Sequence, residues 1–348
     1  MELETALRDQ TVRNIVREVG INPNHWYAIA RSAQLQPEKV LPVVFWRQSL
    51  AVFRDNQGQV HVLDDICPHK GVSLHKGTVQ GCHLVCPYHG WEYDGASGEC
   101  AAIPYLPEGQ KLPRASVRSY PVQERYGLIW IFPGAPELAD QKMVLDVPQA
   151  EEDGWLDVLL EAHFKAHFSI CNENTMDVFH GHLHAKHQAW YDTKLVKLQE
   201  TPDLVQAQYD VTYQNWLAPL LGLSERGNQV TTQRITIEYI YPHLRSSLGN
   251  LSRLYLLRMP VNEYESHSFG LFFFKVKIPR FLNPLKPLIR SIVVNWVLMK
   301  FLVQDIEMME DEQQTYQNEP NRRYVEINPA ILAMQRLIVR QFEQVIKA

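Results

Sequence analysis

Two cysteines and two histidines form two short clusters in the first third of the chain. The first cluster is Cys67-Pro-His69 and the second is Cys86-Pro-Tyr-His89, with sixteen residues between His69 and Cys86. Two thiolates and two imidazoles can bind Zn²⁺ tetrahedrally, or a [2Fe-2S] cluster with both cysteines on one iron and both histidines on the other. Zinc sites commonly pair like residues, whereas each cluster here supplies one cysteine and one histidine. The spacing favours the iron–sulfur cluster over zinc, or over a set of unrelated core residues.

Histidines gather a second time between residues 163 and 187, where six of the fourteen in the chain lie. On a helix, at about 100° per residue, four side chains would share one face. These are Asp177, His180, His184 and His187. Two imidazoles one helical turn apart can bind one metal ion, and two histidines with one carboxylate leave positions open for O₂ on non-haem Fe(II).

Asp305 is the candidate carboxylate for such a site. It lies in a segment that is predicted to be helical from Pro287 to Asn318. Because it follows Phe301 by four residues and Leu298 by seven, it projects from the apolar face of that helix. An unpaired carboxylate there would be costly, and a metal ion would offset the cost. The alternative is a surface acid on an amphipathic helix.

The elements that carry the first cluster are predicted to be strands. Residues 1–22 are expected to form a charged helix. From Trp26 to Phe132, β-prone runs such as Val60–Leu63 alternate with turn residues. Asn56-Gln57-Gly58 suits a hairpin turn between two of these runs. We therefore expect an all-β domain in this part of the chain.

The second half of the chain is predicted to mix helices and strands. Pro133–Gly154 is a candidate linker, followed by a His-rich helical segment near residues 161–190 and by alternating strands such as Phe269–Lys277. The fold class is therefore α+β: an all-β domain, then a domain of antiparallel sheet with flanking helices. The predicted units are an N-terminal helix packed on the second domain, the all-β domain and the α+β domain, at residues 1–22, 23–140 and 141–348.

Composition narrows the function classes. With 34 basic and 39 acidic residues the net charge is −5, which disfavours nucleic acid and anionic membranes as partners. Five cysteines in 348 residues are too few for a disulfide scaffold, so a reducing, cytoplasmic location is expected. No secretory or membrane-spanning segment is expected, because the most apolar run, Leu288–Val303, is interrupted by polar residues.

The first two clusters resemble the Rieske domain of the Rieske non-haem iron oxygenases, whose pattern is CPHRG followed by CPYHGW. This chain departs from the pattern only at Lys70, where arginine is usual. Respiratory and photosynthetic Rieske proteins carry a disulfide between the loops, and Val72 and Tyr88 occupy those positions here. The resemblance implies that a [2Fe-2S] cluster binds to Cys67, His69, Cys86 and His89.

The same resemblance extends to the second site. The family carries N-x-x-D-x-x-H followed by a second histidine, which implies His180 and His184 as iron ligands, with His187 as the alternative second ligand. A carboxylate on a late helix completes the family's ligand set, and here Asp305 fits. In the family, the aspartate before the first histidine bridges to a cluster histidine of the neighbouring subunit. The implied relay runs from His89 through Asp177 to His180.

These assignments imply the terminal oxygenase component of the phthalate/vanillate demethylase-like branch. A separate ferredoxin or flavin reductase, fed by NAD(P)H, would reduce the cluster. The mononuclear Fe(II) would then use O₂ to hydroxylate or dihydroxylate a small hydrophobic or aromatic organic substrate. A head-to-tail homotrimer is the implied assembly. The alternatives are O- or N-demethylation by the same chemistry, and a Rieske electron-transfer or sensor protein without oxygenase activity.

Overall fold

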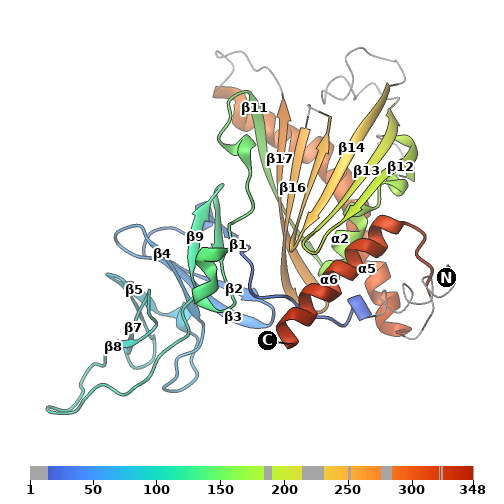
Figure 1. Ribbon diagram of the computed structural model, residues 1–348. Helices are drawn as coiled ribbons and strands as arrows, with labels where there is room; N and C mark the ends of the chain where they lie inside the picture. The colour runs from blue at the N-terminus through green and yellow to red at the C-terminus, as the bar shows by residue number, and fades with distance from the viewer. Residues whose placement is uncertain are drawn as a thin grey trace. The chain divides into compact units, whose positions relative to one another are not determined.

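The computed structural model divides the chain into two compact units, which are described separately (Figure 1). One unit is Pro23–Asp146, and the other joins the residues before it to Val147 and beyond. The structure describes residues 15–183, 190–213, 231–249, 252–275, 284–320, 322 and 324–347. Most of the predicted N-terminal helix, as well as His184 and His187, therefore lies outside the described residues. Among the described residues, no helix has the length and apolar character needed to cross a bilayer.

The unit Pro23–Asp146 is built from three small antiparallel sheets. Their strand orders are β1(Tyr27–Arg31)-β10(Leu128–Ile131)-β9(Val122–Arg125), β2(Val40–Phe45)-β3(Gln48–Arg54)-β4(Val60–Asp64) and β5(Thr78–Gln80)-β6(His83–Val85)-β7(Glu92–Asp94)-β8(Cys100–Ala102). The predicted hairpin joins β3 to β4, where the Asp55 carboxylate accepts the backbone N–H groups of Gln57 and Gln59. The core of this unit buries Cys67 and Cys86 among aromatic and aliphatic side chains.

The second unit is a seven-stranded antiparallel sheet with helices. The strand order is β11(Trp155–Phe164)-β17(Glu265–Lys275)-β16(Ser252–Asn262)-β15(His243–Leu248)-β14(Thr231–Ile240)-β13(Leu204–Tyr213)-β12(Tyr191–Glu200). The helices are α2(Phe168–Met176), α4(Lys286–Ile292), α5(Met299–Asn318) and α6(Pro329–Ile346). A π-helical turn, η8(Val293–Leu298), joins α4 to α5, and α2 contacts β16, β17, α5 and α6. The predicted α+β class is confirmed.

The helical segment predicted near residues 161–190 is confirmed only in part, because among the described residues it contains the helix α2 and the 3-10 helix η5(Phe179–Leu183) and starts within a strand. Residues up to Phe164 belong to β11, which pairs with β17 over ten residues. Every second residue of β11 from Leu156 to Phe164 is apolar, a period-2 pattern that indicates a strand. Helix α2 ends at Met176, because Asp177 is extended, with φ −83° and ψ 103°. Asp177 and His180 therefore do not share one helix, and His180 lies in the separate 3-10 helix η5(Phe179–Leu183).

A buried ion-pair network joins the segment before Asn22 to two helices. Arg17 donates to both carboxylate oxygens of Glu173 in α2, at 2.5 and 2.7 Å, and to Glu312 in α5 at 2.9 Å. Arg17 and Glu173 are buried. Glu312, which lies seven residues after Asp305 in α5, therefore serves this network.

We expect Arg17→Ala to lower the free energy of unfolding of this unit by about 3 to 5 kcal/mol, because it leaves Glu173 buried without its cation. Urea unfolding followed by circular dichroism measures this change. The matched control is Arg234→Ala, which breaks a surface ion pair between Arg234 and Asp210 in the sheet of the same unit. This substitution is expected to change the free energy of unfolding little. Equal stability of the two variants would contradict the prediction.

Candidate active site

The Cys67 and Cys86 loops have the same hydrogen-bond pattern. Each cysteine N–H donates to the carbonyl five residues ahead, Cys67 to Val72 at 2.9 Å and Cys86 to Trp91 at 2.8 Å. Each cysteine carbonyl accepts the N–H of the glycine four residues ahead, and both glycines have positive φ, 70° and 69°. Such φ values favour glycine because it has no Cβ. The two motifs therefore fold locally into a pair of matching loops.

The donor atoms of these loops are arranged in two layers. Cys67 and Cys86 are buried, whereas His69 is half-buried and His89 is exposed. The two imidazole centroids are 4.6 Å apart, and the His69 ring stacks on Trp91. Burial raises the pKa of the Cys86 thiol, and the neighbouring Cys67 side chain adds to the rise. Two buried cysteines beside two more accessible imidazoles fit a [2Fe-2S] cluster with unlike ligands on its two irons.

Tyr93 is a neighbour of this site that sequence reasoning missed. Its hydroxyl lies 3.1 Å from Cys67 Sγ, and both residues are buried. Burial raises the pKa of Tyr93 far above its ordinary value. The phenol therefore keeps its proton and can donate it to a Cys67 thiolate.

We expect Tyr93→Phe to lower the reduction potential of the bound cluster by on the order of 50 mV, because a hydrogen bond to a ligand sulfur stabilises the reduced state. A redox titration of the holoenzyme followed by EPR measures this shift. Tyr105→Phe, at a fully exposed tyrosine of the same unit, is the matched control. An unchanged potential in Tyr93→Phe would show that this hydroxyl does not influence the cluster.

The His180 imidazole lies between two carboxylates. Its Nδ1 is 3.6 Å from Asp177 Oδ2, and its Nε2 is 3.6 Å from Asp305 Oδ1. Burial lowers the pKa of His180, but the two carboxylates outweigh burial and raise it overall. Burial acts in the opposite direction on Asp177, whose pKa is nevertheless held below its ordinary value by His180 and the Phe179 N–H. Asp177 is therefore ionised at neutral pH.

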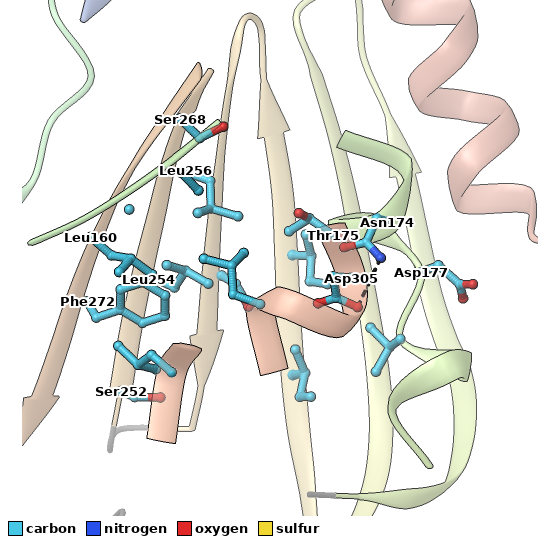
Figure 2. A pocket seen from close by; sticks show the side chains of 18 of the residues that line it. Leu160, Asn174, Thr175, Asp177, Ser252, Leu254, Leu256, Ser268, Phe272 and Asp305 are labelled. Atoms are coloured by element: carbon cyan, nitrogen blue, oxygen red, sulfur yellow. Dashed lines mark hydrogen bonds between the residues drawn. The ribbon is translucent and has the colours of Figure 1, made fainter. Parts of the chain in front are cut away.

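The structure brings His180 and Asp305 together from elements that are far apart in the sequence. Two ligand atoms on one iron, each about 2.1 Å from it and at right angles, would be about 3 Å apart, so the observed 3.6 Å separation fits a shared metal ion. The Asn174 amide donates to Asp305 Oδ1 at 3.3 Å, which Figure 2 shows as a dashed line. The third predicted ligand, His184, and its alternative, His187, lie outside the described residues.

An apolar cavity of about 350 Å³ reaches this pair of side chains. It lies against one face of the sheet, because alternate residues of β16 line it: Ser252, Leu254, Leu256 and Arg258. Gly270 and Phe272 of β17 and Leu160 of β11 extend the same face. Phe272 and Leu160 are labelled in Figure 2. The opposite wall includes Leu298 and Leu302, which precede Asp305.

Comparisons with known proteins agree with this architecture. Residues 25–121 match the Rieske [2Fe-2S] domain. The chain is 34% identical to the 4beta-methylsterol monooxygenase of Methylococcus capsulatus over 98% of its own length and 95% of that protein. It is 37% identical to the dicamba O-demethylase oxygenase component of Stenotrophomonas maltophilia over 48% of each chain. The crystal structure of dicamba monooxygenase bound to 3,6-dichlorosalicylic acid shares its fold, with a TM-score of 0.79, 24% identity and coverage of 95% of this chain and 100% of that one.

A Rieske domain followed by this α+β domain defines an iron–sulfur oxygenase. The chain belongs to the Rieske non-haem iron oxygenases and is an oxygenase component of that family. The resemblance stated from the sequence is thereby confirmed, and an enzyme is favoured over an electron carrier. The preference for an iron–sulfur cluster over zinc at the first site agrees with the match to the Rieske [2Fe-2S] domain.

Proposed function

We propose that this chain is the terminal monooxygenase of a multicomponent system and acts on an elongated, apolar, polycyclic substrate of sterol size. A separate ferredoxin or flavin reductase, reduced by NAD(P)H, would supply the electrons. One oxygen atom of O₂ would be inserted into a C–H bond of the substrate. The full-length similarity to a 4beta-methylsterol monooxygenase supports this substrate class over the small aromatic substrate expected from the sequence.

The length of the cavity is the observation that carries the proposal. It is lined along β16 from Ser252 to Arg258, six residue steps that span roughly 20 Å at about 3.3 Å per residue. Most of its lining side chains are aliphatic or aromatic. A long apolar trough that reaches His180 and Asp305 suits a rigid hydrocarbon skeleton better than a single small ring.

The residues of the chain have separate roles in this proposal. His180, His184 and Asp305 would hold an iron ion that activates O₂, and Cys67, His69, Cys86 and His89 would hold the cluster that supplies electrons. Asp177 would fix the His180 ring through Nδ1 and, in a head-to-tail homotrimer, would also contact His89 of the neighbouring subunit. The Asn174 amide orients Asp305. The apolar walls would exclude water from the reacting carbon.

O-demethylation is the second candidate, because the dicamba O-demethylase component is 37% identical to this chain over 48% of its length. The chemistry would be the same, since hydroxylation of an O-methyl carbon releases formaldehyde. The substrate would differ, being a methyl ether in place of an apolar skeleton.

The test is substrate-stimulated O₂ uptake by the iron-loaded enzyme with a surrogate reductase and NADH. A 4-methylsterol and vanillate are compared as substrates, with ¹⁸O₂ as the oxygen source. We expect O₂ uptake with the sterol and a product that carries one labelled oxygen. Formaldehyde release from vanillate, without any sterol product, would favour the demethylase. A preparation that holds about two irons per chain, and never about three, would contradict both candidates.

A further inference from the structure

Arg258 is a buried cation at the end of the cavity nearest to Asp305. The residue is 4% exposed, yet it lines the cavity. Two hydrogen bonds locate the guanidinium relative to the candidate iron ligands. Arg258 Nη2 donates to Thr175 Oγ1 at 2.9 Å. The next residue along the chain toward the N-terminus, Asn174, donates to Asp305. The guanidinium therefore faces the same end of the trough as the candidate iron ligands.

The hydrogen-bond partners of Arg258 are neutral, while its guanidinium also lies 5.4 Å from the Phe164 ring centroid and is attracted by the Asp305 carboxylate. It donates to Asn172 Oδ1 at 3.3 Å, Ser268 Oγ at 2.6 Å, the Cys171 carbonyl at 2.8 Å and Thr175 Oγ1 at 2.9 Å. No carboxylate of a described residue forms an ion pair with it. Arg17 provides the contrast within the same unit, because this buried arginine has two carboxylate partners, Glu173 and Glu312.

One hydrogen-bond donor of Arg258 is left over. A guanidinium has five N–H groups, and the contacts above use four, two of them on Nη2 and only one on Nη1. A buried cation with an unused N–H group is costly when it stays unpaired in an apolar site. An oxygen atom of a bound ligand would satisfy this N–H group and the charge together.

We propose that Arg258 anchors the substrate through a hydroxyl, carbonyl or carboxylate oxygen. This inference rests on the proposed function and adds a feature to the substrate class: an apolar skeleton with an oxygen at one end. The substrate binds with that end next to the candidate iron ligands, and its hydrocarbon body follows β16 toward Ser252. The carbon that is oxidised is consequently close to the oxygen substituent.

The experiment compares two ligands that differ in this oxygen alone. Dissociation constants are measured by equilibrium dialysis of a radiolabelled 4-methylsterol with its 3-hydroxyl group and of the same skeleton without it. We expect the wild-type enzyme to bind the hydroxylated sterol roughly ten- to hundredfold more tightly, the range for a hydrogen bond to a charged group. Arg258→Met should bring this ratio close to one. Arg234→Met, outside the cavity in the same sheet, should leave the ratio unchanged.

The outcomes separate this inference from the proposed function. Equal binding of both sterols by the wild-type enzyme overturns the anchor and leaves the substrate class intact. A preference that persists in Arg258→Met assigns the anchor to another residue. Binding of neither sterol overturns the proposed substrate class and the anchor together. If Arg258→Met fails to fold, as judged by circular dichroism, the wild-type comparison alone decides.

Discussion

Replacing Asp305 by alanine is expected to remove the mononuclear iron and to abolish oxygenation, while the Rieske cluster stays intact. The carboxylate lies 3.6 Å from His180 Nε2 and accepts from Asn174, so it is positioned to bind a metal ion that His180 also binds. Alanine leaves the site with histidine ligands alone. Iron analysis should fall from about three to about two atoms per chain, with the visible absorption of the cluster unchanged.

The control for this variant is Asp311→Ala, an exposed carboxylate on the same helix, α5. It should retain full iron and full turnover, which separates loss of a ligand from loss of helix charge. If Asp305→Ala keeps its mononuclear iron, the carboxylate is not a ligand and the assignment fails. If both variants lose the cluster as well, the defect is one of folding.

The first site was predictable because its geometry is local. Each loop closes on itself within five residues, from Cys67 to Val72 and from Cys86 to Trp91. The residue types and their spacing therefore carry most of the information that the fold uses there. Tyr93 was not predictable, because its contact with Cys67 depends on how β7 packs against the loop.

The second site depends on contacts between distant segments, and the sequence predicted its residues better than its shape. Helical periodicity put Asp177 and His180 on one helix, whereas α2 ends before them and a 3-10 helix follows. Asp305 joins them from more than a hundred residues away, through the packing of α2 against α5. The metal roles of these residues stay predictions.

Arg258 and the helix α6 were missed although the sequence carried a signal for each. Ser252, Leu254, Leu256 and Arg258 are alternate residues of one predicted strand and therefore share one face of the sheet. A charged residue at the end of this mainly apolar series was a usable signal of a special role. Helix α6 begins at Pro329 with Asn328 as its N-cap, and its start signal was equally legible. What the sequence did not contain was the sheet order, which brings β11 beside β17 and so forms the cavity wall.

Asp177→Asn is expected to abolish turnover while both metal centres remain bound. Asparagine keeps the size of the side chain and can still accept the Phe179 N–H, which Asp177 accepts at 3.0 Å. The substitution removes the negative charge that lies 3.6 Å from His180 Nδ1. It also removes the carboxylate oxygen that would accept a hydrogen bond from the His180 ring and, in the proposed trimer, would link this ring to the partner subunit. Single-turnover product formation and rapid-freeze EPR of cluster oxidation measure the effect.

The pH dependence of this variant follows from the lowered pKa of Asp177. A carboxylate with a lowered pKa is charged at every pH above the ordinary aspartate pKa of about 4. It loses this charge only when the pH falls further, to its lowered pKa. Titration of Asp177 should therefore cause no change in wild-type turnover across neutral pH, and Asp177→Asn should stay inactive throughout that range. Asp192→Asn, at an exposed aspartate beside Lys194, is the matched control and should turn over normally. Full turnover in Asp177→Asn would end the relay assignment, because a neutral amide would then serve as well as the carboxylate.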